Sequence, residues 1–170
     1  GRATYDPFAV ISSGTWVIVM AQGTDLARLR PERDMLANID AFGHPVATAR
    51  FMGGREHAAI AGPDGPSQRP TRAHLQAVIA RNALPLPSFA AGTGPFPQAT
   101  GQLLHAADLD PAERAALATA YVALMCDLCL DELGSDQEII VDGPLAADGL
   151  FGAVLATLRP SRRGLLADRR

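Results

Sequence analysis

One long apolar stretch with a marked beginning and end constrains the fold most: DPAERAALATAYVALMCDLCLDELG, at residues 110–134. Asp110 is a typical helix N-cap, Pro111 suits the first helical position, and Glu113 completes a capping box in which Asp takes the place of Ser or Thr. Gly134 predicts the C-terminal stop. The Ala, Leu, Val and Met residues between these ends cover more than one helical face, so we expect a buried helix rather than a surface helix.

Two cysteines lie within this stretch, Cys126 and Cys129, and their C-x-x-C spacing suggests a redox or metal site. The predicted helix contains no histidine, and the sequence has no second cysteine pair that would complete a tetrahedral zinc site. The four histidines are dispersed and form no H-x-H or H-x-x-x-H pair. We therefore expect both cysteines to face the core as small apolar residues, and we expect no metal site.

A strand, a turn and a second helix follow in QEIIVDGPLAADGLFGAVLATLRP. The pattern predicts a short strand at residues 138–141, an Asp-Gly-Pro break, and a helix that starts at about Asp148 and ends before Pro160. Such a unit places backbone N–H groups and a helix N-terminus beside the carboxyl end of a strand, which is the usual nucleotide position in an open α/β sheet. GLLADRR, at residues 164–170, predicts the start of one more strand.

Strands are also predicted near the start of the sequence, where VISSGTWVIVM interrupts two apolar runs with a Ser-Ser-Gly-Thr turn. Taken alone, this turn is either a hairpin corner, the commoner case, or a phosphate-binding turn. A third strand is predicted in HPVATARFMGG, whereas residues 26–38 are charged and broken by Pro31. Gly53 and Gly54 then lead into a predicted helix. We expect these three early strands to form an antiparallel start to a sheet.

Residues 62–101 are rich in proline and are expected to be mostly ordered loop, with one helix in TRAHLQAVIARNAL. LPSFAAGTGPFPQATG has enough apolar residues to pack over a surface or to line a cleft. Its GTGPFP segment lacks the Lys-Ser/Thr ending of a P-loop, so we interpret it as a packed loop at the margin of a cleft. Arg55 and Glu56 either face that cleft or form a surface ion pair, which is the commoner arrangement.

Length and charge exclude several classes of protein. With 170 residues, 48% of them hydrophobic, the sequence suits one domain with a substantial core. The 15 basic and 18 acidic residues form no cationic stripe, so nucleic acid is not an expected partner. All 15 basic residues are Arg, which excludes a lysine clamp or Schiff base. The sequence has no apolar run of ~20 residues and no leader segment, so a membrane is not an expected partner. Free thiols favour a cytoplasmic location.

The order of these elements resembles half of the actin-like, ribonuclease H-like ATPase fold of sugar kinases, hexokinases, actin and heat-shock chaperone ATPases. ISSGTWVIVMA, NIDAFGHPVATARFMGGREH, FAAGTGPFP and IIVDGPLAADGLFGAVLATLRP resemble the C-terminal domain of FGGY-family carbohydrate kinases, most closely the L-fuculose and L-rhamnulose kinase branch. The resemblance implies an α/β fold whose mixed sheet has three early antiparallel strands and flanking helices. It also implies that residues 1–170 are a single C-terminal nucleotide-binding domain of a two-lobed sugar kinase, truncated at both ends.

The resemblance further implies an ATP-binding lobe that uses Mg²⁺ and transfers the ATP γ-phosphoryl group to a hydroxyl of a sugar, a ketose. The family's phosphate-binding turn falls on Ser13, Gly14 and Thr15. Its adenosine motif falls on Asp142, Gly143, Pro144 and Asp148. Pro144 replaces a usual glycine and removes an N–H donor, and Asp148 replaces a common asparagine and offers only acceptors. We therefore expect nucleotide affinity or base preference to differ from the family pattern.

No catalytic residue is expected within this sequence, because the catalytic base of the family lies in its N-terminal half. Asp6 is the nearest acid but lacks the surrounding motif, so we interpret it as a loop residue before Pro7. The isolated chain is therefore expected to be inactive, and the missing N-terminal lobe to bind most of the sugar. The alternative is a non-catalytic, kinase-like module that binds nucleotide or protein. A homodimer remains open, and the sequence does not identify the sugar.

Overall fold

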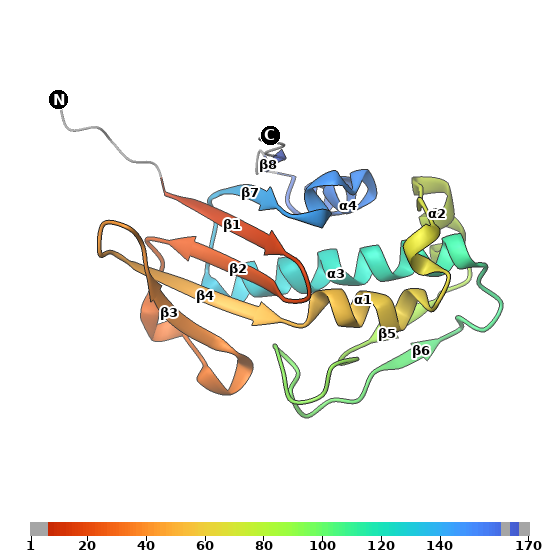
Figure 1. The fold of residues 1–170 in the computed structure, drawn as a ribbon, viewed down its shortest axis with the longest axis horizontal. Helices are drawn as coiled ribbons and strands as arrows, with labels where there is room; N and C mark the ends of the chain where they lie inside the picture. Colours follow the sequence, from red (N-terminus) through yellow and green to blue (C-terminus); the bar gives the residue numbers. More distant parts are fainter. Residues whose placement is uncertain (1–6, 161–163, 167–170) are drawn as a thin grey trace.

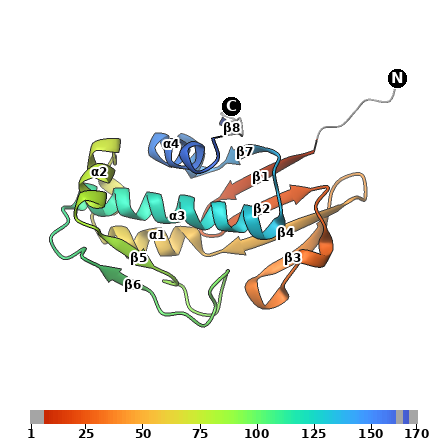
Figure 2. The same cartoon turned by 180° about the vertical axis from the view of Figure 1, so that it is seen from behind.

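A six-stranded mixed sheet forms the main layer of the protein, in a computed structural model that describes residues 7–160 and the backbone of residues 164–166. The strand order is β3-β4-β2-β1-β7-β8 (Figures 1 and 2). The strands are β1 Phe8–Ser13, β2 Val17–Gln22, β3 Met35–Ile39, β4 Pro45–Phe51, β7 Glu138–Asp142 and β8 Gly164–Leu166. The first four strands pair antiparallel, whereas β7 and β8 continue the sheet in parallel from β1. The predicted mixed sheet is confirmed.

Strand β1 is central because it pairs antiparallel with β2 on one side and parallel with β7 on the other. Alternate residues of β1 and β2 are buried, as the two-residue period of a strand requires: Ala9, Ile11, Val17, Val19 and Ala21. Ser13 pairs with Val17, so the two strands join through the tight turn at residues 14–16. Ser12 pairs with Asp142. The turns that follow β1 and β7 therefore lie at the same edge of the sheet.

Four α-helices lie within the described residues: α1 Gly53–Ala61, α2 Arg72–Ala80, α3 Pro111–Leu133 and α4 Gly149–Leu158. Helix α3 packs against β2 and β4 and against the other three helices, and it lies behind the sheet in Figure 1 and in front of it in Figure 2. Its central position confirms the predicted buried helix, and Cys126 and Cys129 are both completely buried in it. Across the described ranges, no helix combines the length and the apolar character needed to cross a membrane.

The ends of α3 have the predicted caps. The Asp110 carboxylate accepts a hydrogen bond from the Glu113 N–H at 2.8 Å, and the Glu113 carboxylate accepts one from the Asp110 N–H at 3.1 Å. Pro111 occupies the first helical position, and Gly134 ends the helix in the left-handed conformation with φ 68°. The capping box and the glycine stop therefore set the helix bounds.

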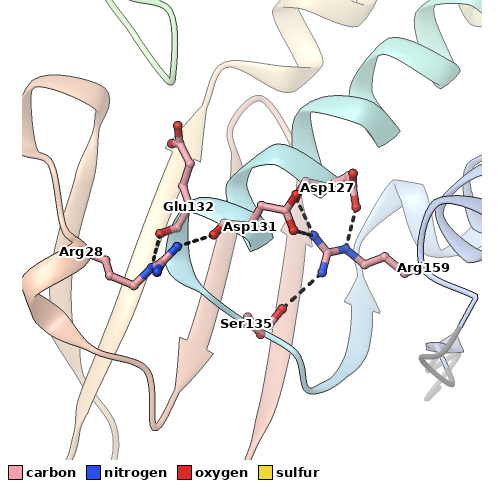
Figure 3. Close-up of polar contacts among 6 residues, drawn as sticks. All are labelled: Arg28, Asp127, Asp131, Glu132, Ser135 and Arg159. Atoms are coloured by element: carbon pink, nitrogen blue, oxygen red, sulfur yellow. Dashed lines mark hydrogen bonds and ion pairs between the residues drawn. The ribbon is translucent and has the colours of Figure 1, made fainter.

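Two arginines from distant segments hold the C-terminal end of α3 (Figure 3). Arg28, in the short 3-10 helix η1 (Leu26–Arg28), donates hydrogen bonds to the carbonyl oxygens of Asp131 at 2.9 Å and Glu132 at 3.0 Å. Arg159, which follows α4, donates to the Asp127 carboxylate at 2.6 Å and to the Asp127 carbonyl at 2.8 Å. Because the last carbonyls of a helix lack an N–H donor four residues further on, Arg28 supplies donors to two carbonyls of the last turn, whereas Arg159 joins the side chain and backbone of Asp127 to the segment after α4.

Three strands were not predicted. Strand β3 (Met35–Ile39) begins inside residues 26–38, where charged residues and Pro31 indicated a break. Met35 is the only buried residue of this strand. Strands β5 (Leu84–Leu86) and β6 (Gln102–Leu104) form a separate two-stranded sheet at the ends of the proline-rich segment. The predicted helix in that segment, the helix after Gly53, and the strand at residues 164–166 are confirmed.

The segment at residues 86–101 packs over the surface, as predicted. The Gly94 N–H donates to the Asp34 carboxylate at 2.8 Å, and the Arg33 guanidinium donates to the Pro95 carbonyl at 2.8 Å. Arg33 also lies over the ring of Phe96, with 5.7 Å between the guanidinium carbon and the ring centroid. These contacts attach the segment to the β2–β3 region of the fold.

Candidate functional site

A cavity of about 720 Å³ opens where three segments that are far apart in the sequence meet. The turn after β1, the start of α1 and the turn after β7 surround it, and α3 contributes Val122. The lining residues are Ser13, Gly14, Thr15, Val17, Gly53, Gly54, Arg55, His57, Ala58, Val122, Pro144, Leu145 and Asp148. A cavity at the carboxyl ends of parallel strands is the usual ligand position in an open α/β sheet.

Backbone contacts without side chains bring these segments together. Gly143 has φ 80°, and a Cβ atom there would lie 2.2 Å from the Ser13 carbonyl oxygen. A Cβ atom at Gly54 would lie 2.4 Å from the Gly14 carbonyl oxygen, and the Gly54 N–H donates to the Thr15 carbonyl at 3.2 Å. Only glycine permits such close approach. The turn after β1 is therefore held between α1 and the turn after β7.

The hydroxyl of Ser13 connects the two turns. It donates a hydrogen bond to the Asp142 carbonyl at 2.7 Å and accepts one from the Leu145 N–H at 3.0 Å. Gly14 and Thr15 are exposed in the cavity, and the Thr15 hydroxyl has no partner among the described residues. Ser13 therefore supports the turn, whereas Gly14 and Thr15 remain accessible to a ligand.

Asp148 has two roles in the structure. Its Oδ1 accepts hydrogen bonds from the N–H groups of Leu150 at 2.9 Å and Phe151 at 3.1 Å, which makes it the N-cap of α4. Its Oδ2 accepts a hydrogen bond from the Thr119 hydroxyl of α3 at 3.1 Å. Both carboxylate oxygens are thus engaged by protein donors, and the residue also lines the cavity.

His57, on α1, lines the cavity next to the hydrogen-bonded pair of Asp148 and Thr119. Its Nε2 lies 3.4 Å from the Thr119 hydroxyl, and the ring is half-buried. Burial lowers the pKa of His57 below its usual 6.5, although the negative charge of Asp148 opposes that effect. The geometry and the burial together favour a neutral imidazole in the cavity.

The start of α1 presents an arginine to the cavity. Met52, at the N-cap, makes no side-chain capping bond, and Arg55 in the first turn is exposed and lines the cavity. Glu56 is completely buried on the other side, where its carboxylate accepts hydrogen bonds from the Tyr121 hydroxyl and, at 3.0 Å, from the Phe89 N–H. The expected surface ion pair is therefore wrong, because Glu56 is buried and consecutive side chains of a helix do not face each other.

The structure brings most of the predicted site residues together. Ser13, Gly14, Thr15, Pro144 and Asp148 line one cavity, whereas Asp142 and Gly143 form the supporting turn beside it. Residues 86–101 do not line this cavity, and Gly94 packs against Phe51 just before the start of α1; the position of GTGPFP at the margin of a cleft stays a prediction. Sequence reasoning missed His57; its position on the same helix as Arg55, just after the double glycine, was the available signal. Asp6 lies outside the described residues.

Comparisons with known proteins give a family and a fold. Residues 5–170 match the model of the family described as "Carbohydrate kinase FGGY, C-terminal domain". A carbohydrate kinase from Novosphingobium aromaticivorans is 35% identical, with a TM-score of 0.81, over 94% of this chain and 36% of that protein. A search of curated sequences gave no match.

More distant solved structures share the fold alone. Xylulose kinase from Bifidobacterium adolescentis is 17% identical, with a TM-score of 0.59, over 93% of this chain and 32% of that protein. Gluconate kinase from Lactobacillus acidophilus is 12% identical, with a TM-score of 0.63, over 90% of this chain and 34% of that protein. The chain therefore spans about a third of the length of the solved structures that it matches.

Proposed function

This chain belongs to the FGGY carbohydrate kinases as their C-terminal domain, and we propose that it is the ATP-binding lobe of an enzyme that phosphorylates a sugar hydroxyl. The observation that supports this most directly is the cavity between Gly14, Gly54 and the turn after β7. Backbone turns at the carboxyl ends of parallel strands, beside a helix N-terminus, provide N–H donors for phosphate groups.

The phosphates would bind at the turn after β1. Gly14 and Thr15 are exposed there, and the Thr15 hydroxyl is a further donor. The N-terminus of α1, without a side-chain cap, faces the same cavity and favours negative charge. Arg55 supplies a positive charge, which is important in a sequence without lysine. These groups would position the phosphate chain and neutralise part of its charge.

The nucleoside would bind toward the turn after β7. Leu145 and the ring of Pro144 provide an apolar surface there, and Ala58 and Val122 add to the apolar lining of the same cavity. Such surfaces bury the base of a nucleotide, and a few polar groups then fix its orientation. Pro144 offers no N–H donor, so shape and apolar contact would contribute more here than backbone hydrogen bonds.

The reaction would need groups outside this chain. When bound, Mg²⁺ neutralises charge on the transferring phosphoryl group. In the parts of the chain that the structure describes, no set of three His, Cys, Asp or Glu side chains is placed to hold a metal ion, and we assign the ion to the nucleotide phosphates. Sugar binding and the catalytic base are assigned to the other lobe of the full-length enzyme. Closure of the two lobes would exclude water as a competing acceptor.

Calorimetry of ATP and adenosine with the full-length protein tests the phosphate assignment. Arg55→Gln should weaken ATP binding by about tenfold and leave adenosine binding unchanged, since the guanidinium would contact only phosphate. Arg72→Gln is the matched control, because Arg72 is exposed on α2 and does not line this cavity. Equal affinities of the Arg55 variant and the wild-type protein for ATP would contradict the assignment.

The reaction is tested by ADP release from ATP in the presence of L-fuculose, L-rhamnulose, L-ribulose, D-xylulose and gluconate. We expect one sugar to stimulate ADP release by the full-length enzyme, and no stimulation with the isolated 170-residue chain, because a single lobe cannot close over a substrate. Stimulation of the isolated chain at a similar rate would place the base within this chain.

A non-catalytic binding module is the second candidate. The lack of an N–H donor at Pro144 and the engagement of both Asp148 oxygens by protein groups favour it, because they remove two nucleotide contacts that the family motif provides. Failure of the full-length protein to bind ATP or ADP at millimolar concentrations would support this candidate over the kinase.

A further inference from the structure

A short hydrogen-bonded series of side chains determines which nitrogen of His57 carries its proton. Asp148 accepts the hydroxyl proton of Thr119 at 3.1 Å, and Thr119 is completely buried. The hydroxyl has only one hydrogen, so its oxygen can act only as an acceptor toward His57. The Nε2 atom of His57, 3.4 Å away, must then carry the proton that it shares with Thr119.

The other nitrogen of His57 is consequently a bare acceptor. In a neutral imidazole, protonation of Nε2 leaves a lone pair on Nδ1. Burial lowers the pKa of His57 and thereby favours the neutral ring. Within residues 7–160, Nδ1 has no hydrogen-bond partner, and the residue lines the cavity. A ligand in that cavity can therefore supply the missing donor.

We propose that Nδ1 of His57 accepts a hydrogen bond from the nucleoside part of the ligand, from a ribose hydroxyl or from the exocyclic amino group of the purine. This inference rests on the proposed nucleotide-binding function. A phosphate oxygen does not suit the position, because two acceptors would face each other without a proton between them. Ala58 and Val122, which line the same cavity, provide the apolar surroundings in which an unpaired acceptor selects for a donor.

Two amide substitutions test the roles of the two ring nitrogens separately. His57→Gln keeps an N–H near the position of Nε2 for Thr119 but removes the acceptor at Nδ1. His57→Asn keeps an acceptor near Nδ1 but loses the contact with Thr119. His44→Gln is a control, because that side chain is 74% exposed on the β3–β4 hairpin, away from the cavity.

Calorimetry of the full-length variants with ATP, 2′-deoxy-ATP, 3′-deoxy-ATP and purine riboside triphosphate identifies the donor. His57→Gln should weaken ATP binding by about tenfold, and His57→Asn and His44→Gln by no more than about threefold. The analogue that lacks the donor should bind the wild-type protein about tenfold more weakly than ATP and should be insensitive to His57→Gln. This last comparison separates direct contact from a general loss of structure.

Nitrogen NMR of the full-length protein provides a readout independent of activity. We expect the Nε2–H tautomer of His57 at pH 7.5, with a change in the Nδ1 resonance when ATP binds. An Nδ1–H tautomer, or unchanged ATP affinity in His57→Gln, would overturn the inference while leaving the nucleotide site intact. A wild-type protein that binds none of the four nucleotides would instead overturn the proposed function, and this inference with it.

Discussion

The cavity and the C-terminal end of α3 both join distant parts of the sequence, but they do so by different means. At the cavity, Gly54 and Gly143 bring three backbone segments into direct contact. At the end of α3, the guanidinium groups of Arg28 and Arg159 connect segments through hydrogen bonds (Figure 3). Both sets of contacts, here called joints, are close to the ends of helices, where backbone groups lack partners within the helix.

The difference lies in what each joint leaves unpaired. At the end of α3, Arg159 also donates to the Ser135 carbonyl at 3.2 Å and to the Asp131 carboxylate, so the acceptors that the two arginines contact are satisfied by the protein itself. Among the described residues, Glu132 Oε2 and the Ser135 hydroxyl oxygen are buried there without a hydrogen-bond partner. At the cavity, the close contacts use few side chains, and the exposed Gly14 and Thr15 remain available. The glycine contacts therefore leave backbone groups of an open cavity accessible to a ligand, whereas the arginine contacts use protein donors to pair acceptors at the end of a helix.

Substitution of Gly143 by Ala should have the largest effect on this comparison. The new Cβ atom would overlap the Ser13 carbonyl oxygen at 2.2 Å, and alanine at φ 80° is strained, so we expect a loss of about 3 kcal/mol or more in the free energy of unfolding. Gly149→Ala is the control, because no atom lies within 4 Å of its Cβ position. Denaturant unfolding of the full-length protein measures both; similar stabilities would show that the close approach is easily relaxed.

Removal of the Arg159 side chain should have the next largest effect. Arg159→Met keeps the apolar stem but leaves the partly buried Asp127 carboxylate and the buried Ser135 carbonyl without their donor, which should cost about 2–4 kcal/mol in the free energy of unfolding. Arg159→Lys should restore only part of this loss, since an ammonium group cannot reach all these acceptors. ATP affinity, measured by calorimetry at a temperature where the variant is folded, should stay unchanged. A parallel loss of ATP affinity would mean that the two joints are coupled.

The pH dependence of stability should reveal the neutral His57 in a smaller effect. Its pKa in the folded protein lies below the usual 6.5, so the unfolded chain binds more protons as the pH falls through 6.5. The free energy of unfolding should therefore decrease from pH 7.5 to pH 5.5 by more in the wild-type protein than in His57→Gln. Thermal melts of both proteins at the two pH values measure the difference. An equal decrease in both would mean that His57 titrates normally in the folded protein.

Thr15→Val should have the smallest effect on stability and still affect function. Thr15 is exposed and makes no side-chain hydrogen bond within the described residues, so the free energy of unfolding should change by less than about 0.5 kcal/mol. Loss of the hydroxyl should lower kcat/KM for ATP by about three- to tenfold in the full-length enzyme. Unchanged kinetics would support the interpretation of the Ser-Ser-Gly-Thr turn as a hairpin corner.

The sequence predicts those parts of the fold whose structure depends on residues close together in the chain. Asp110, Glu113 and Gly134 define α3 because a cap depends on residues within four positions of each other. Strand β3 was not predicted because it lies at an edge of the sheet and has one buried residue, Met35, so its sequence lacks the apolar alternation of a half-buried strand. Strands β5 and β6 are three residues each, too short for an alternating pattern.

The candidate site was predictable only in part, for the same reason. The Ser-Gly-Thr turn and the Asp-Gly-Pro turn are visible as motifs, and the structure places them together. The contact of His57 with Thr119 joins residues 62 positions apart and depends on how α1 packs on α3. Similarly, Asp148 was recognised by its position in a motif, but its bond to Thr119 follows from the packing of α4 on α3.

The connection between Ser13 and the turn after β7 has a consequence for folding kinetics. Ser13 and Asp142 are 129 positions apart, so the cavity can form only after nearly the whole described chain has closed on itself. Contacts between residues so distant in sequence slow folding and tend to form after local helices and hairpins. A ligand that binds only the completed cavity should therefore reduce the unfolding rate and leave the refolding rate almost unchanged.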